Sequence, residues 1–278
     1  MIGRFKISIS ILGTILSDII TGDTLSPDFV SQKLVFLWIR LPRCIMAVLV
    51  GMCLSVSGGV YQAMFRNPLV SPAVAMTISI ARLISIKPII VMVLAGMVVL
   101  SFFNALLMIL KYFSDPYDEL PSIVFWIMGS LTRVTWHDVF ITLAVTSCGL
   151  LVFILLRFRL NILSLGDIQA KSLGINPFIS RVILIVLSSF MVAMVVATCG
   201  QIAWLGLIIP HMARTLVGPK HETMIPVTAL LGAIFMLAAD VLARSMTTAE
   251  IPVGIITAIT GAPIFCFLLY KNRGSGWL

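Results

Sequence analysis

The stretch "VILIVLSSFMVAMVVATCGQIAWLGLIIPHMA", Val182 to Ala213, decides the fold because it is apolar and contains no acidic residue, no lysine and no arginine. A helix needs about 20 apolar residues to cross the hydrocarbon core of a bilayer, so this stretch is too long for one crossing. The tripeptide "CGQ", Cys199 to Gln201, is its natural break and leaves a short second piece. The stretch predicts two successive membrane helices.

The rest of the chain has the same character. Hydrophobic residues make up 60% of its 278 residues, charged residues only 11%, and the mean hydropathy is +1.12. A soluble domain of this length does not need so much apolar surface, so the sequence predicts an all-α, polytopic bundle forming a single transmembrane domain over residues 1–278. The expected spans are 5–20, 44–65, 88–110, 139–156, 182–199, 203–217, 224–243 and 252–270.

Eight spans place both termini on the same side of the membrane. The first span follows "MIGRFK" and is expected to be a retained helix rather than a signal peptide, because no convincing small-residue cleavage site follows it. With the N-terminus inside, thirteen Lys and Arg residues fall in inner segments and six in outer ones, which agrees with the positive-inside rule. Both termini are therefore expected in the cytoplasm. The six outer residues are Lys33, Arg40, Arg43, Lys111, Arg133 and Arg244.

Arg40, Arg43 and Arg244 are exceptions to that rule because they lie directly beside apolar spans on the outer side. One interpretation is that they reach lipid headgroups or pair locally, since Asp240 lies four residues before Arg244 on the same helical face. The other is that they bind an acidic partner on the outer surface. Composition alone leaves both open. The net charge of +8 is spread among short loops, so nucleic acid is not an expected partner.

One inner loop is long, "RFRLNILSLGDIQAKSLGINPFISR", Arg157 to Arg181. It predicts a short helix, a turn at Gly166 and a second short helix from about Asp167 to Gly174, with Asp167 in a first turn that favours an acid. Connections within bundles are usually shorter, so a partner is expected to hold this hairpin. The alternative, a helix lying on the membrane surface, would require a more amphipathic pattern.

The chain contains no obvious source of energy. It lacks a GxxxxGK[ST] phosphate loop, and Asp18 and Asp240 fall near the outer ends of spans rather than at the midplane where ion-coupled carriers need charge. A separate ATPase on the long inner loop is therefore expected. No Ser/His/Asp, HExxH or paired-carboxylate pattern predicts an enzyme. His211 and the five scattered cysteines are interpreted as core residues rather than metal ligands.

Seven motifs, in order along nearly the whole chain, resemble the permease subunits of iron-siderophore and cobalamin ABC importers. They are "RLPR" (40–43), "QAMFRNPLVSP" (62–72), "FWIMGSL" (125–131), "NILSLGDIQAKSLGI" (161–175), "GLIIPHMAR" (206–214), "LLGAIFMLAADVLAR" (230–244) and "AEIPVGIITAITGAPIF" (249–265). The resemblance implies a homodimer in a bacterial or archaeal inner membrane, with the transport path on its two-fold axis. It also implies two ATPase subunits, which bind ATP and Mg, and a periplasmic or lipid-anchored substrate-binding protein.

The resemblance also implies roles for individual residues. Arg40, Arg43 and Arg244 would meet glutamates of the binding protein. The hairpin would couple the permease to the ATPase through Leu163, Ser164, Leu165, Gly166, Asp167, Ala170, Leu173 and Gly174, and the pathway would be lined by Met92, Gly96, Met97 and Phe103. This chain would hold no cofactor of its own. An iron-siderophore is the first expectation for the cargo, with cobalamin, haem and molybdate or another oxyanion left open.

The chain departs from the family pattern after "RNPLVSP", Arg66 to Pro72. Family members have ten crossings, whereas this sequence lacks about two of them, because "AVAMTISIARLISIK" leads directly into the apolar run from Pro88 to Leu110. Losing two crossings preserves the orientation of everything downstream. The shortening leaves an inactive or regulatory membrane scaffold as one alternative function. A secondary carrier or channel is the other, and the absence of midplane charges disfavours it.

Overall fold

The computed structural model describes residues 13, 27–65, 88–247 and 250–271, and among these it contains helices and connecting turns but no strand. Four helical stretches in this part of the chain are long and apolar enough to cross a membrane: Val30–Phe65, Trp136–Leu155, Pro177–Cys199 and His221–Ser245. The chain is thus an all-helical integral membrane protein. The helices are α2 (Pro27–Leu34), the π-helix η1 (Val35–Arg40), α3 (Leu41–Phe65), α5 (Pro88–Phe113), α6 (Glu119–Ile127), α7 (Trp136–Leu155), α8 (Arg157–Leu165), α9 (Asp167–Ser172), α10 (Pro177–Cys199), α11 (Leu205–Val217), α12 (His221–Ser245) and α13 (Val253–Lys271).

Each expected span that falls in the described residues coincides with a helix, from α3 to α13, with boundaries that differ by a few residues. Of the expected span 5–20, the structure describes only Gly13. The short helices α2 and α6 and the π-helical turn η1 were not among the expected spans. The predicted break in the long apolar stretch is confirmed, because α10 ends at Cys199, Gly200 adopts a φ of 72° and α11 begins at Leu205.

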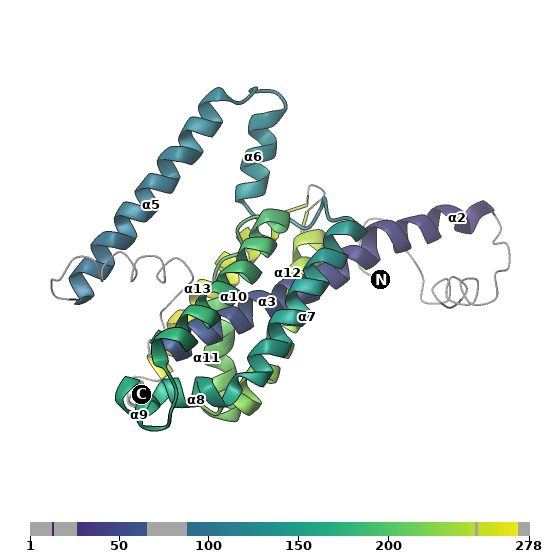
Figure 1. Cartoon of the computed structure of the whole chain (residues 1–278). Coiled ribbons are helices and arrows are strands. Elements are labelled where there is room, and N and C mark those ends of the chain that lie inside the picture. Colours follow the sequence, from purple (N-terminus) through teal and green to yellow (C-terminus); the bar gives the residue numbers. More distant parts are fainter. Residues whose placement is uncertain (1–12, 14–26, 66–87, 248–249, 272–278) are drawn as a thin grey trace.

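Helix α3 forms the centre of the bundle, with α7, α10, α11 and α12 packed around it (Figure 1). Its residues are buried on every side over most of its length, which explains why small residues are frequent in it. A Cβ atom on Gly51 would collide with the backbone of Gly232 in α12, and one on Gly58 with the backbone of Gly206 in α11. These glycines therefore allow α3 to approach both neighbours closely, as is common between membrane helices.

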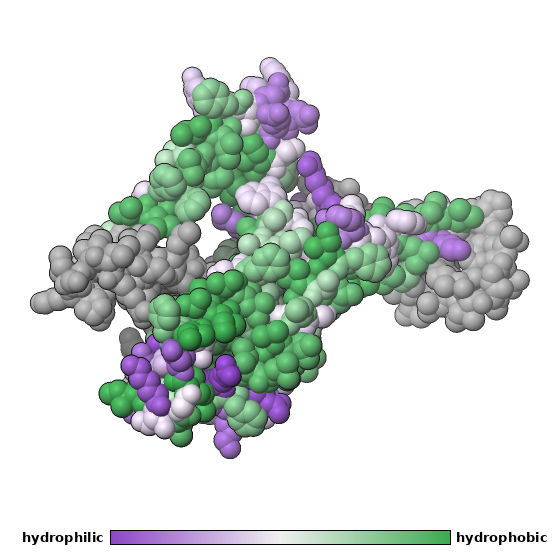
Figure 2. Space-filling model, in the orientation of Figure 1, coloured by the Kyte–Doolittle hydropathy of each residue, from purple (hydrophilic) through white to green (hydrophobic). Residues whose placement is uncertain are grey.

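Helices α3 and α12 run antiparallel, so each end of the pair combines the start of one helix with the end of the other. At one end, which we call the arginine end, Arg43 lies near Asp240 and Arg244. At the opposite end, which we call the hairpin end, the hairpin of α8 and α9 lies beside the start of α12 and the last turn of α3. Figure 2 shows hydrophilic residues gathered around this hairpin, with a largely hydrophobic flank above it.

Helix α5 stands apart from the bundle in Figure 1, whereas the end of α6 meets α10, where Trp126 Nε1 donates to the carbonyl oxygen of Ala197 at 3.2 Å. The side chains of α5 that the structure describes, from Met97 to Phe113, are mostly apolar and mostly exposed. The other described helices leave α5 largely uncovered, and an apolar helix in that position needs lipid or another protein surface around it.

Candidate functional site

The arginine end contains a buried network of charges. Arg43, at the start of α3, is only 5% exposed, and its Nε donates to Oδ1 of the fully buried Asp240 at 2.8 Å. Its Nη1 donates to Oε2 of Glu250 at 2.6 Å. Arg244 Nη2 lies 3.0 Å from Asp240 Oδ2, one turn further along α12. Asp240 therefore forms ion pairs with two arginines, and the network connects α3, α12 and the segment before α13.

This network confirms local pairing, one of the two interpretations left open by the sequence, for Arg244 with Asp240 and also for Arg43, whose partners the sequence did not identify. The guanidinium of Arg43 lies inside the protein, where two carboxylates already bind it. Its docking to a partner's glutamate stays a prediction, and docking would require these ion pairs to open. Arg40 ends η1, is partly buried, and lies close enough to Arg244 for the two positive charges to repel each other.

At the hairpin end, the structure confirms the expected turn at Gly166. Helix α8 ends at Leu165, Gly166 adopts φ 122° and ψ 167°, and α9 begins at Asp167. That conformation is open almost only to glycine. The predicted coupling residues divide between two faces. Leu163 and Ala170 are fully buried against the bundle, whereas Ser164, Leu165, Asp167, Leu173 and Gly174 are exposed.

Helix α8 is anchored to the start of α12 through one asparagine. Asn161 Oδ1 accepts hydrogen bonds from the backbone N–H of His221 at 3.0 Å and from ring Nδ1 at 2.7 Å. Asn161 Nδ2 donates to Oε1 of Glu222 at 2.8 Å. The first residues of α12 have backbone N–H groups without helical partners, and Asn161 satisfies one of them. It thus fixes α8 to α12.

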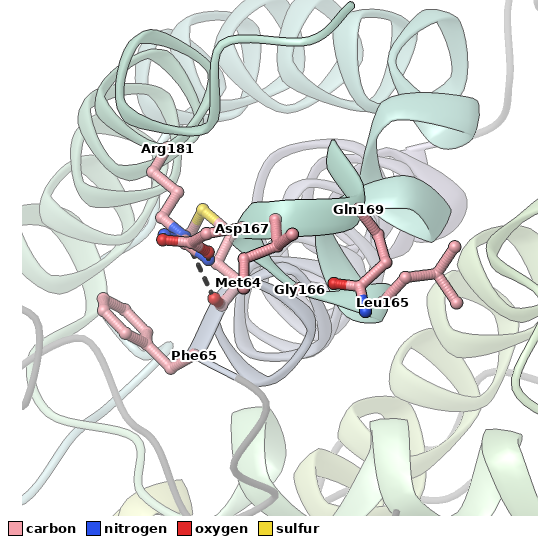
Figure 3. A pocket seen from close by; sticks show the side chains of 8 residues that line it. Met64, Phe65, Leu165, Gly166, Asp167, Gln169 and Arg181 are labelled. Carbon is pink, nitrogen blue, oxygen red and sulfur yellow. Dashed lines mark hydrogen bonds and ion pairs between the residues drawn. The ribbon is translucent and has the colours of Figure 1, made fainter. Parts of the chain in front are cut away.

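Helix α9 is anchored separately, by Arg181 in the first turns of α10. Arg181 Nη1 and Nη2 donate to the two carboxylate oxygens of Asp167, at 3.0 and 2.5 Å, and Arg181 Nε donates to the carbonyl oxygen of Met64 at 3.2 Å. These residues and the turn at Gly166 line an open pocket of about 570 Å³. Figure 3 shows Arg181 reaching between Asp167 and the end of α3.

The residues expected to line the pathway lie on α5. Met97 and Phe103 are 53% and 48% exposed, and Met92 and Gly96 belong to the same helix. Because α5 stands apart from the bundle (Figure 1), the structure does not bring these residues together with the arginine end or the hairpin. Among the residues that the structure describes, no group of three His, Cys, Asp or Glu side chains is arranged to hold a metal ion.

The sequence did not predict three contacts between side chains at the two ends of the bundle. They are Arg43 with Asp240, Arg181 with Asp167, and Asn161 with His221. The sequence could have predicted one of these contacts in part. An acidic residue inside an apolar helix requires a buried partner, and Asp240 is such a residue. The identity of that partner was not readable, since Arg43 lies 197 residues away. Arg181 carried no signal beyond its positive charge.

The sequence profile described as the FecCD transport family matches residues 1–91 and 73–271. The chain is similar to the molybdate import system permease protein MolB of Haemophilus influenzae, with 38% identity covering 99% of this chain and 91% of the relative. It is also similar to a protein of Helicobacter pylori described as a probable iron chelatin transport system permease protein, with 39% identity covering 88% of this chain and 85% of that one.

Among solved structures, the chain is similar to one described as an inward-facing conformation of a metal-chelate type ABC transporter. The TM-score is 0.78 at 36% sequence identity, covering 94% of this chain and 99% of the other. The alignment with MolB spans 312 positions, although this chain has 278 residues, so that relative contains residues that this chain lacks. The two profile matches overlap at residues 73–91, directly after the departure noted at Pro72.

Proposed function

Because this chain belongs to the FecCD transport family, we propose that it is the transmembrane permease subunit of an ATP-binding-cassette importer. It provides the path across the inner membrane, a separate ATPase subunit drives transport, and a substrate-binding protein delivers the cargo. The relatives that carry this proposal are themselves named as import or transport permeases.

The single observation that best supports this function is the arrangement of the hairpin. Its inner face is fixed to the bundle by Leu163, Ala170 and the polar anchors, while Leu165, Ile168 and Leu173 remain 58%, 79% and 59% exposed. Exposed leucine and isoleucine side chains on a fixed, short element are typical of a surface that a protein partner covers. We assign this surface to the ATPase subunit, which would bind the ATP and Mg because the permease sequence offers no phosphate loop.

The arginine end is proposed to receive the substrate-binding protein. Arg40 and Arg244 add positive charge at the end opposite the hairpin, and basic residues there would steer an acidic partner toward the membrane. Arg43 would act differently from its neighbours in this proposal. Held by Asp240 and Glu250, it keeps α3 and α12 in register so that the other two arginines are presented together.

The proposed functional unit is a homodimer with a central path. The exposed apolar side chains of α5, including Met97 and Phe103, support this because a second copy would cover part of that surface. The same residues would then lie beside the cargo, where thioether and aromatic groups suit a bulky chelate.

For the cargo we propose a metal chelate, with a ferric siderophore as the first candidate. Molybdate is the second candidate because the similarity to MolB extends over 99% of this chain. The identities to the two relatives, 38% and 39%, do not choose between these cargoes. The binding protein is expected to select the ligand, and the permease to offer a path of suitable width.

The test is uptake by proteoliposomes containing this chain, its ATPase and its binding protein, offered in parallel ferric siderophore, cobalamin, haem and molybdate. ATP-dependent accumulation of one cargo would support the importer and identify its substrate. Accumulation that persists without ATP would favour a secondary carrier. A complex that assembles and hydrolyses ATP but accumulates none of these would favour the inactive or regulatory scaffold, the alternative that the expected shortening after Pro72 leaves open.

A further inference from the structure

We propose that Arg181 is a positioning residue that fixes α9 to the end of α3, so that the hairpin presents one orientation to the ATPase. This inference deepens the proposed function and rests on the role of the hairpin stated there. It concerns a residue outside the coupling motif itself, on the helix that follows the hairpin.

Arg181 divides its hydrogen-bond donors between two partners. Two nitrogens form a paired contact with the carboxylate of Asp167, and Nε binds the carbonyl oxygen of Met64. The Arg181 side chain is only 14% exposed, although that of Asp167 is 56% exposed. A paired arginine–carboxylate contact fixes direction as well as distance, which a single hydrogen bond does not.

The two partners of Arg181 lie at opposite kinds of helix end. Met64 belongs to the last turn of α3, where carbonyl oxygens have no helical donor and a positive charge is favoured. Asp167 opens α9, where a negative charge is favoured. Arg181 therefore joins the C-terminal end of α3 to the N-terminal end of α9. In both contacts the charge has the sign that the helix dipole at that end favours.

The two halves of the hairpin have different anchors. Asn161 holds α8 to α12. Only Gly166 separates α8 from α9, and a glycine permits a wide range of backbone φ and ψ angles. Helix α9 has six residues and buries little besides Ala170. Its direction relative to α8 thus depends strongly on the contact with Arg181.

A loosened α9 would weaken docking for a simple reason. A partner that binds a fixed surface loses less conformational freedom than one that must first order it. Fixing α9 to α3 has a further effect, because α3 continues to Arg43 at the opposite end of the bundle. Displacement of the hairpin would then move α3 rather than bend the turn at Gly166.

The experiment uses the full chain in lipid nanodiscs, with Cys148→Ser and Cys266→Ser removing the two exposed native thiols among the described residues. A nitroxide attached at Gln169→Cys reports the motion of α9 by electron paramagnetic resonance. The dissociation constant of the ATPase subunit is measured on the same nanodiscs. The variants are Arg181→Ala, Arg181→Lys and the control Lys171→Ala, which removes a positive charge from α9 without touching the pair with Asp167.

We expect Arg181→Ala to sharpen the nitroxide spectrum and to raise the dissociation constant about tenfold, the scale expected when a few side chains must be ordered on binding. Arg181→Lys should give an intermediate result because lysine cannot form the paired contact. Lys171→Ala should leave the nitroxide spectrum unchanged. A merely structural role in folding would instead lower the yield of all hairpin variants without changing the spectrum of the folded fraction.

Two results would overturn the inference. An unchanged nitroxide spectrum in Arg181→Ala would show that other contacts position α9. A sharpened spectrum with an unchanged dissociation constant would show that the direction of α9 does not matter for docking. Failure of the proposed function looks different, because then the unsubstituted chain itself binds no ATPase while the nitroxide still responds to Arg181→Ala.

Discussion

Arg43 and Asp240, 197 residues apart in the sequence, form a salt bridge of 2.8 Å between Nε and Oδ1 with both side chains almost fully buried. The contact joins the start of α3 to the last part of α12. Arg244 and Glu250 complete it from the solvent side, so that Asp240 accepts two positive charges. The arginine end is therefore a structural joint as well as a proposed docking surface.

The first prediction concerns this joint. Replacing Arg43 by methionine should destabilise the protein by about 3 kcal/mol, because it leaves a carboxylate buried with one partner fewer. Fluorescence-detected size-exclusion chromatography after heating would measure the loss. The double variant Arg43→Met, Asp240→Leu should be more stable than Arg43→Met alone, because it removes the buried charge as well. Equal stability of the two variants would mean that burying the Asp240 carboxylate without Arg43 costs little, which would contradict this prediction.

The second prediction concerns the close approach of α3 and α12. Gly51→Ala should reduce the yield of folded protein sharply, because its Cβ would collide with backbone atoms of Gly232 that have no room to move. Gly59→Ala is the matched control on the same helix. Its Cβ would lie 3.3 Å from the flexible end of Met224 and 3.4 Å from the ring of Pro210, so a small shift suffices. Comparable yields would contradict the packing described here.

The third prediction concerns the turn at Gly166. A valine there must adopt a φ of 122°, at a cost of about 1–3 kcal/mol, and the turn would relax to another shape. The bundle should still fold because the strain is confined to the hairpin. We expect ATP hydrolysis to continue while transport per ATP falls, which proteoliposome assays measure. Ser172→Ala, on the same hairpin, should behave as the unsubstituted chain; a Gly166→Val variant that does so too would exclude the coupling role.

The fourth prediction separates docking from folding at the arginine end. Arg40→Glu should weaken binding of the substrate-binding protein and should destabilise the permease less than Arg43→Met does, because Arg43 and Asp240 keep their contact. A single exposed charge pair contributes less than about 1 kcal/mol, so we expect an effect of up to fivefold per protomer, mostly on the association rate.

Surface plasmon resonance at two salt concentrations provides the measurement. Raising the salt should slow association of the unsubstituted chain more than that of Arg40→Glu, because screening acts on an attraction that the variant has lost. Arg159→Glu, a charge reversal on α8 at the hairpin end, is the control. If both reversals change the association rate equally, the arginine end does not have a special role in docking.

The fifth prediction concerns orientation. Single cysteines at Ser31, Asp118 and Gln169 all occupy exposed positions. With the arginine end outside, a membrane-impermeant maleimide should label the first two in intact cells and Gln169 only after permeabilisation. Labelling of the cysteine in Gln169→Cys in intact cells would contradict the orientation deduced from the positive-inside rule. It would also exchange the sides of the membrane on which the two proposed docking surfaces lie.

Apolar runs located the described long helices correctly, but hydropathy placed some of their starts too late. Helix α7 begins at Trp136 rather than 139, after a capping box formed by Thr135 and Asp138. Helix α10 begins at Pro177 rather than 182, after the N-cap Asn176. A charged residue near each start, Asp138 in α7 and Arg181 in α10, ended the apolar window although both residues are helical, and the capping residues give the better boundary.

The contacts between distant residues could not be predicted in the same way. A helical pattern determines which face of α12 carries Asp240, but not which of several outer arginines reaches it. That choice depends on how closely two helices approach, and Gly51 and Gly232 decide this together. The hairpin was easier to predict because its turn, helix starts and exposed face are encoded within a single short segment.

The salt bridge between Arg43 and Asp240 also has a consequence for biosynthesis. Ribosomes add about 5–20 residues per second, so Asp240 is made about 10–40 seconds after Arg43. During that interval α3 is already available for insertion while its guanidinium has neither of its two carboxylates, because Glu250 is made later still. The guanidinium of Arg43 must therefore remain in contact with water, at the membrane surface, until α12 has been synthesised and inserted. Assembly of this end of the protein is thereby delayed until synthesis is almost complete.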